Sequence, residues 1–127
     1  MACLDTSVII EFLHSNDIVT RLVSQYQQTE PISTTSVTEY ELLKYQNPRE
    51  AEVSRELLES LEIHAFDRSA ALESSKMFME LKKKGTPISD TDILIAGIAA
   101  SRNETLITMD KDFERLGYNK IVVVGRE

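Results

Sequence analysis

Short β-prone runs alternate with longer helical stretches along the whole chain, and this alternation constrains the fold more than any other feature of the sequence. Strands that are separated by helices pair in parallel, because the chain has to cross over the sheet between them. The pattern therefore predicts an α/β fold in which helices cover both faces of a parallel sheet. The expected strands are Ala2–Leu4, Ile32–Thr34, Glu62–Phe66, Thr105–Thr108 and Ile121–Val124.

The stretches between these runs have the periodicity of helices. Val53, Leu57 and Leu61 recur on one helical face. The stretch Asp92–Ser101 is apolar on nearly every side, which predicts a buried helix, and Gly97 would let a neighbouring element approach it closely. The expected helices are Val8–Leu13, Ile18–Gln27, Val37–Gln46, Ala51–Ser60, Ala70–Lys84, Asp92–Ser101 and a short one near Phe113–Leu116.

The composition is that of an acidic globular protein. The 127 residues carry 14 basic and 21 acidic side chains, a formal net charge of −7. Neither a repeat nor a Ser/Gly-rich linker divides the sequence, which predicts a single domain over residues 1–127. The acidic balance argues against broad electrostatic adhesion to nucleic acid, but it leaves open an enzyme that handles phosphates through bound cations.

Cysteine and histidine usage and the apolar runs bear on redox state and location. Cys3 is the single cysteine, which excludes an internal disulfide and suits a reducing cytosol. His14 and His64 share no spacing with a nucleophile, so we expect them to be structural or surface residues. The longest apolar stretch, Ile93–Ala100, is far shorter than the ~20 residues of a membrane span. With no pattern of a secretory signal at the N-terminus, we expect a cytoplasmic protein with no membrane partner.

Four acidic residues lie close to the ends of expected strands or open the buried helix. Asp5 ends the first strand, and Asp110 follows the fourth. Glu39 lies in the first turn of the helix after the second strand, and Asp92 opens the buried helix. Ligands of open α/β sheets bind at the carboxyl ends of the strands. We therefore expect these four carboxylates to gather at one edge of the sheet.

Helix capping is the alternative explanation for each of these acids. The pairs Ser36/Glu39 and Ser89/Asp92 match the capping-box pattern, and Asp5 could cap the first helix. Capping needs no convergence, however, since Ser, Thr or Asn would serve as well. Four gathered carboxylates would repel one another and raise one another's pKa unless a cation neutralised them. Oxygen ligands without His or Cys favour Mg²⁺ or Mn²⁺.

Further polar residues beside these acids are candidates for supporting roles. The hydroxyls of Thr6, Ser7 and Thr108 could orient a carboxylate, a water molecule or a phosphate oxygen. Backbone capping is the alternative for all three hydroxyls. Asp90 could be an outer ligand of a metal ion, and Asp112 fits a helix start that the helix dipole stabilises.

Four segments of the sequence resemble the motifs of PIN domains, and in particular those of the VapC-like ribonuclease toxins of type II toxin–antitoxin systems. These segments are Leu4–Ile10, Ser36–Glu39, Asp92–Ala96 and Leu106–Phe113. The resemblance covers nearly the whole chain, and its order and spacing are more specific than any one motif. It implies a PIN-like three-layer α/β/α sandwich with a parallel sheet of about five strands.

The resemblance also implies a function, a metal-dependent endoribonuclease that serves as the toxin of a toxin–antitoxin pair. Asp5, Glu39, Asp92 and Asp110 would be the catalytic acids that bind Mg²⁺ or Mn²⁺, with Thr108 in support. The implied partners are an RNA substrate, a second copy in a homodimer and a small antitoxin. A bound cation would activate water and polarise the scissile phosphate, and one ion or two would be compatible with the sequence.

Two expectations concern how those partners bind. An apolar segment of the antitoxin could dock around Ile9, Phe12 and Leu13, although the same residues could instead pack in the core or at a homodimer interface. With four Phe, four Tyr and no Trp, we expect base stacking to contribute little to RNA binding.

Two other functions are compatible with parts of the pattern. An aspartyl-phosphate phosphatase also begins with an Asp after the first strand, but it needs a second Asp two residues later, where this chain has Ser7. A non-catalytic PIN-like binding scaffold is the other alternative. Loss of one of the four acids would indicate such a scaffold, and all four are present.

Overall fold

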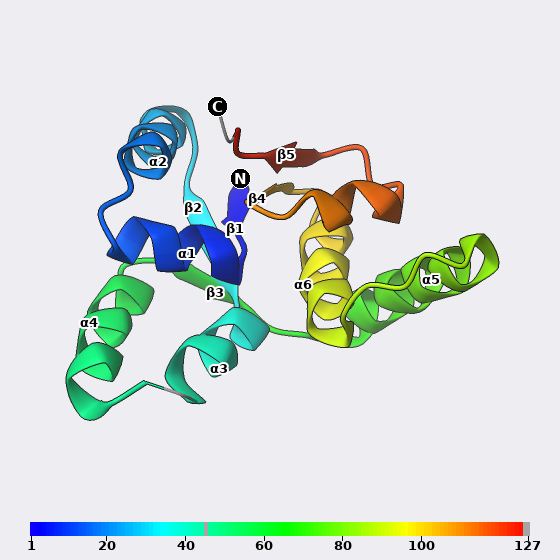
Figure 1. Cartoon of the computed structure of the whole chain (residues 1–127), viewed down its shortest axis with the longest axis horizontal. Helices are drawn as coiled ribbons and strands as arrows, with labels where there is room; N and C mark the ends of the chain where they lie inside the picture. The colour runs from blue at the N-terminus through cyan, green and yellow to red at the C-terminus, as the bar shows by residue number, and fades with distance from the viewer. Residues whose placement is uncertain (45, 126–127) are drawn as a thin grey trace.

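Five strands form one sheet in the structure, a computed structural model that describes residues 1–44 and 46–125. The strand order is β3-β2-β1-β4-β5, and every neighbouring pair is parallel (Figure 1). The predicted α/β class and five-stranded parallel sheet are therefore confirmed. The strands are β1 (Ala2–Leu4), β2 (Ile32–Thr35), β3 (Glu62–His64), β4 (Thr105–Thr108) and β5 (Ile121–Val123).

Most helices begin before the first residue predicted for them, because polar side chains cap their first turns. Asp67, for example, accepts a hydrogen bond from Ala70 N at 3.0 Å, so a helix predicted from Ala70 begins two residues earlier. The helices are α1 (Thr6–Leu13), α2 (Asp17–Thr29), α3 (Ser36–Lys44), α4 (Pro48–Glu59), α5 (Arg68–Lys84), α6 (Asp90–Ser101) and the 3₁₀ helix η1 (Lys111–Leu116).

Two boundaries differ from the prediction for other reasons. The helix expected over Val37–Gln46 ends at Lys44, and position 45 lies outside the described residues. Pro48 was expected between elements, but it is the first residue of α4, after the Asn47 cap. Proline suits that position, because the amide hydrogen that it lacks would have no partner inside the helix.

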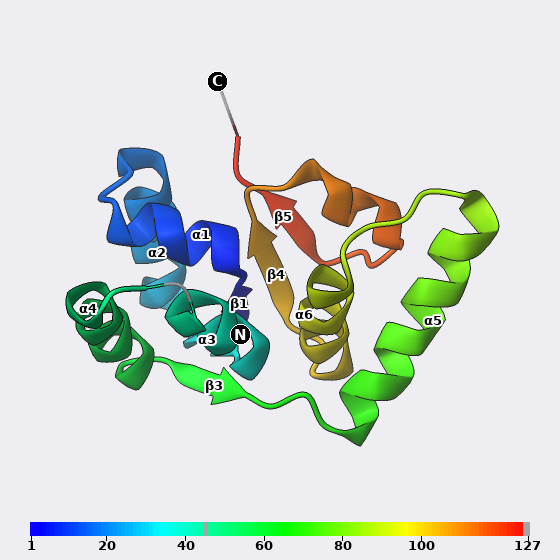
Figure 2. The same cartoon turned by 60° about the horizontal axis from the view of Figure 1, so that its bottom comes forward.

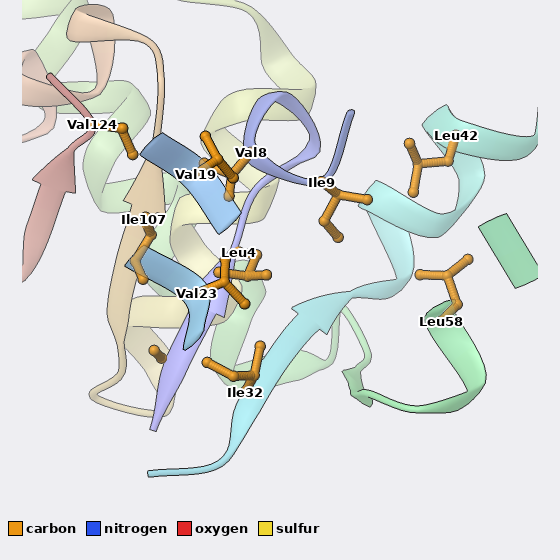
Figure 3. Close-up of a cluster of buried hydrophobic side chains, with 11 residues drawn as sticks. Leu4, Val8, Ile9, Val19, Val23, Ile32, Leu42, Leu58, Ile107 and Val124 are labelled. Atoms are coloured by element: carbon orange, nitrogen blue, oxygen red, sulfur yellow. The ribbon is translucent and has the colours of Figure 1, made fainter. Parts of the chain in front are cut away.

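Alternate residues of the central strands face two separate cores, which makes the molecule a three-layer sandwich. Leu4 and Ile107 contact the core formed with α1 and α2 (Figure 3). Cys3 and Leu106 belong to the core formed with α5 and α6. Figure 1 and Figure 2 show these two pairs of helices on either side of the sheet. Burial raises the pKa of the Cys3 thiol to about 12, as suits a small apolar core residue.

The second core depends on close packing of α5 against α6, as the sequence predicted from Gly97. A Cβ atom at position 97 would overlap the Ser74 hydroxyl and approach the Ala70 carbonyl oxygen to 2.8 Å. The Ser74 hydroxyl in turn donates to the Ile93 carbonyl at 3.0 Å. This packing fixes the start of α6, where Asp92 lies.

None of the helices in the described part of the chain combines the length and the apolar character needed to cross a bilayer. The cytoplasmic location stays a prediction, as does the single domain over residues 1–127, of which positions 45, 126 and 127 lie outside the description.

Candidate active site

Asp5 is buried at the carboxyl end of β1, with 3% of its surface exposed. Its Oδ1 accepts hydrogen bonds from Ser7 Oγ at 2.7 Å and from Val8 N at 3.0 Å, and its Oδ2 accepts one from Thr108 Oγ1 at 2.5 Å. Burial raises the pKa of Asp5 to about 6, these three bonds oppose the rise, and the charge of Asp92 adds to it.

The two hydroxyls that bind Asp5 also tie β1 to the segment after β4. Ser7 Oγ accepts a hydrogen bond from Met109 N at 3.0 Å, and Thr108 Oγ1 accepts one from Asp110 N at 3.0 Å. Each hydroxyl therefore donates to the carboxylate and accepts from the backbone. The structure places Ser7 and Thr108 where they orient Asp5, and their supporting role in a metal site stays a prediction.

Asp92 lies in the first turn of α6, and its side chain is half-buried. Desolvation raises the pKa of Asp92, a hydrogen bond from Ser89 opposes the rise, and the charges of Asp110, Glu41 and Asp112 add to it. Because Asp92 also acts on Asp5, carboxylates from four elements share one electrostatic neighbourhood. We refer to these carboxylates as the acidic group: Asp5, Glu41, Asp92, Asp110 and Asp112.

The structure brings Glu41, and not the predicted Glu39, to the acidic group. Thr6 Oγ1 donates to Glu41 Oε1 at 2.6 Å, which holds the carboxylate beside the start of α1. Glu39 instead lines a cavity together with Arg55 and Glu59 of α4. Residues two apart on a helix point about 200° apart, so both cannot face one site. The predicted position is therefore corrected from Glu39 to Glu41.

The capping alternative for Glu39 does not hold either. The capping box predicted from Ser36 and Glu39 is not formed, because Thr35 Oγ1 accepts the hydrogen bond from Thr38 N at 2.9 Å. Thr38 is fully buried, and Glu41 follows it by three residues, so the two share a face of α3. A small polar residue three positions before an acid, as Thr38 is before Glu41, is the sequence signal that could have indicated Glu41.

The remaining predicted residues lie at the edge of the site. Asp110 caps η1, with Oδ1 accepting from Asp112 N at 2.9 Å. Asp112 is also paired with Arg115 at 3.2 Å. Asp90 begins α6 with an exposed side chain. Capping therefore occurs at Asp5 and Asp110 as the alternative explanation expected, but these same acids also gather near one another.

The donor chemistry of the acidic group fits a hard divalent cation. All of its ligand atoms are carboxylate oxygens, with hydroxyls beside them. In the described part of the chain, Asp112 alone among these acids is paired with a cationic side chain. Within residues 1–44 and 46–125, no three His, Cys, Asp or Glu side chains are placed to hold a metal ion together. Apart from Asp112, the acids therefore lie near one another without a cationic partner among the described residues, but they do not form a complete metal-binding site.

This arrangement of acids at the carboxyl edge agrees with the comparison against protein families. A family model of the PIN domain matches residues 2–118. The chain belongs to the PIN-domain family. All members of the acidic group lie within the matched residues, so the PIN domain contains every element that builds the site.

Two relatives with known names place this PIN domain among the VapC proteins. Ribonuclease VapC1 of Haemophilus influenzae (strain R2866) is 32% identical over 120 residues, which cover 89% of this chain and 90% of that protein. The tRNA(fMet)-specific endonuclease VapC of Salmonella typhimurium is 39% identical over 57 residues, 44% of this chain and 43% of that protein. The resemblance to VapC-like toxins predicted from the motifs is therefore confirmed.

Solved structures give the same result for the PIN domain. VapBC-1 from nontypeable Haemophilus influenzae contains a chain with 32% identity and a TM-score of 0.82, covering 96% of both chains. DNA-bound VapBC from Salmonella typhimurium gives 27% identity and a TM-score of 0.86, covering 98% of both chains. VapBC-5 from Mycobacterium tuberculosis, of the VapBC family of toxin–antitoxin systems, gives 30% identity and a TM-score of 0.67 over 97% of both chains.

Proposed function

We propose that this PIN domain is an endoribonuclease that uses bound Mg²⁺ or Mn²⁺ to hydrolyse RNA phosphodiester bonds. The observation that carries the proposal is the buried Asp5 carboxylate, which lies near Asp92 and other acids without a cationic partner of its own among the described residues. The names of its VapC relatives, ribonuclease and endonuclease, support the same activity. A binding scaffold would have no use for buried like charges.

Asp5 and Asp92 would hold the cation, with Glu41 and Asp110 completing its oxygen ligands. A divalent cation supplies a Lewis acid that activates water and polarises a phosphate oxygen. The chain's own contribution is orientation: Ser7 and Thr108 hold Asp5, and Thr6 holds Glu41. Because Ser7 binds Asp5 where a phosphatase would need its second Asp, the aspartyl-phosphate phosphatase is disfavoured.

Cleavage of a mixed RNA pool tests this proposal. With Mn²⁺, the unmodified chain is expected to cleave RNA, and excess EDTA is expected to stop it. Asp5→Asn is nearly isosteric and should abolish cleavage while the protein stays folded, as judged by circular dichroism. Equal cleavage by both proteins would contradict the proposal.

We further propose that the chain is the toxin of a toxin–antitoxin pair. Its structural relatives are VapBC proteins, a family of toxin–antitoxin systems, which supports an antitoxin partner. Ile9 of the expected surface is fully buried in the core and cannot contact a partner. Phe12 and Leu13 pack against that core but are only partly buried, and Leu13 lines a cavity at the end of α1.

A cavity of about 220 Å³ between the end of α1 and α4 is a better docking site for the antitoxin. Val53 in its lining is 52% exposed. Gln46 Oε1 and Ser54 Oγ, also in the lining, are buried and lack a hydrogen-bond partner among the described residues, a cost that a bound segment reaching them would remove. Val53→Glu should abolish co-purification of a small protein from the native host, whereas Lys120→Glu should not. Co-purification that survives Val53→Glu would exclude this site.

The homodimer that the resemblance implies stays a proposal, and α5 offers a face for it. Leu72 and Met79 lie seven residues apart on the outward side of α5, and they are 56% and 52% exposed. Sedimentation velocity should show a dimer for the unmodified chain and a monomer for Leu72→Glu. A dimer that persists in Leu72→Glu would place the interface elsewhere.

A further inference from the structure

A cavity of about 300 Å³ lies between the end of α5 and the start of α6. Phe78, Leu81, Pro87 and Ile88 give it mainly apolar walls, and Ile93 closes it on the side of α6. Arg115 joins Pro87 of this lining to Asp112 of the acidic group, with a hydrogen bond of 3.5 Å to the Pro87 carbonyl oxygen and an ion pair of 3.2 Å to Asp112. The cavity and the acidic group therefore lie within the reach of one side chain.

Phe78 gives this cavity an aromatic surface that the fold does not use. Its neighbours Met77 and Leu81 on α5 are buried in the core, whereas Phe78 is 47% exposed. An exposed aromatic ring at the wall of a cavity is a platform on which a nucleobase can stack. The cavity has the size of a small-ligand site, and its apolar lining suits the flat face of a base.

Cationic side chains from two elements flank the same cavity. Lys82, one turn after Phe78, belongs to its lining. Arg115 of η1 donates from Nη1 to the Pro87 carbonyl oxygen at 3.5 Å and is paired with Asp112 at 3.2 Å. The net charge of −7 repels a polyanion from most of the surface, so RNA phosphates would have to meet a local group of cations. Lys82 lies in the last turn of α5 and Arg115 in the last turn of η1, so each of them also stabilises a helix end.

We propose that this cavity binds an unpaired nucleobase of the RNA substrate beside the cleaved phosphodiester. The base would stack on Phe78, and the adjoining phosphates would contact Lys82 and Arg115. The proposal rests on the proposed function in taking RNA as the substrate, and it adds that the RNA must be single-stranded at this nucleotide. It also revises the sequence-based expectation that base stacking contributes little.

Tryptophan fluorescence tests the proposal directly, because the chain contains no Trp. Phe78→Trp, combined with Asp110→Asn so that the RNA stays intact, places a single reporter in the cavity. A mixed-sequence single-stranded RNA 12-mer should quench its emission, and the same RNA in a duplex should quench it much less. Phe66→Trp is the matched control. Phe66 is 37% exposed and lies just before the N-terminal end of α5, whereas the cavity lies at the C-terminal end of this helix.

RNA affinity, measured by fluorescence anisotropy of a labelled 12-mer, gives a second readout. Phe78→Ser should weaken binding roughly 5- to 100-fold, and Phe78→Trp should retain it. Lys82→Gln should reduce the slope of log affinity against log salt by about 1. Lys76→Gln, on another face of α5, should leave both quantities unchanged.

Three results would overturn the proposal. If RNA bound without quenching the emission of Phe78→Trp, the base would have to bind elsewhere. If RNA did not bind at all, RNA would be excluded as the ligand of this cavity. If Phe78→Ser changed the sedimentation coefficient but not RNA affinity, the face would belong to an interface between copies of this chain. Failure of the unmodified chain to cleave RNA with Mn²⁺, with quenching intact, would instead reject the proposed nuclease and retain the base site.

Discussion

Asp5 and Glu104 are both buried carboxylates, but their surroundings differ in kind. Glu104 is 4% exposed, and each of its oxygens has a polar partner. Ser33 Oγ donates to its Oε1 at 2.6 Å, and His64 Nε2 lies 2.7 Å from its Oε2. Asp5 is 3% exposed and accepts three hydrogen bonds, but the ionisable group acting on it is the acidic Asp92.

This difference separates a structural acid from a functional one. Glu104 connects β4 to β2 and β3 through Ser33 and His64, so its burial is compensated inside the fold. Burial of Asp5 raises its pKa to about 6, and no cationic side chain in the described chain pairs with Asp5 or with the neighbouring Asp92. A buried acid that the fold leaves uncompensated marks a place where an external cation would be favourable.

The largest effect that this comparison predicts is on catalysis. Asp92→Asn should lower the rate of RNA cleavage at least about 100-fold, because it removes an oxygen ligand of the reacting centre. Glu104→Gln keeps a hydrogen-bonding group of the same size and should leave the rate within a few-fold, measured at a temperature where circular dichroism shows the variant to be folded. Initial rates of RNA cleavage with saturating Mn²⁺ measure both effects. An equal loss of rate in the two variants would contradict the distinction between a structural and a functional acid.

Stability should respond in the opposite order. Glu104→Ala leaves Ser33 and His64 without their buried partner, and we expect it to lower the free energy of unfolding by about 3 to 5 kcal/mol. The exposed Glu52 of α4 is a control, since Glu52→Ala should change stability by less than about 0.5 kcal/mol. Urea denaturation without metal measures both values. A change below about 1 kcal/mol for Glu104→Ala would show that its network does not stabilise the fold.

The stability of the metal-free protein should depend on pH through Asp5. The folded state raises the pKa of Asp5 from its ordinary 3.8 to about 6, so it binds the proton more tightly than the unfolded state. This contribution is fully present below pH 3.8 and is lost as the pH rises to about 6. Relative to Asp5→Asn, the metal-free protein should therefore lose about 1 to 3 kcal/mol between pH 4 and pH 7.

Urea denaturation of both proteins in EDTA across this pH range measures that difference. Other carboxyl groups titrate equally in the two proteins, so their contributions cancel. If the difference in the free energy of unfolding between the two proteins did not change with pH, the folded state would not raise the pKa of Asp5.

The sequence predicted Asp5 and Asp110 correctly as acids at the carboxyl edge, because position after a strand follows from the alternation of elements. The face of a helix is harder to predict. The predicted motif ended at Glu39, and the packing of α3 against α1, through Thr6, brings Glu41 to the site instead. The network of Glu104 was not predictable at all, since Ser33 and His64 are 71 and 40 residues away in the chain.

We expect Asp5, Asp92 and Glu41 to share one divalent cation. Thermal unfolding with increasing Mn²⁺ tests this expectation, because an ion that binds only the folded state stabilises it by about 2.7 kcal/mol at 100 times its Kd. We predict that Mn²⁺ raises the Tm of the unmodified chain and of Glu39→Gln alike, and raises that of Glu41→Gln and Asp92→Asn much less. An equal rise in Glu41→Gln, with a diminished one in Glu39→Gln, would contradict the account.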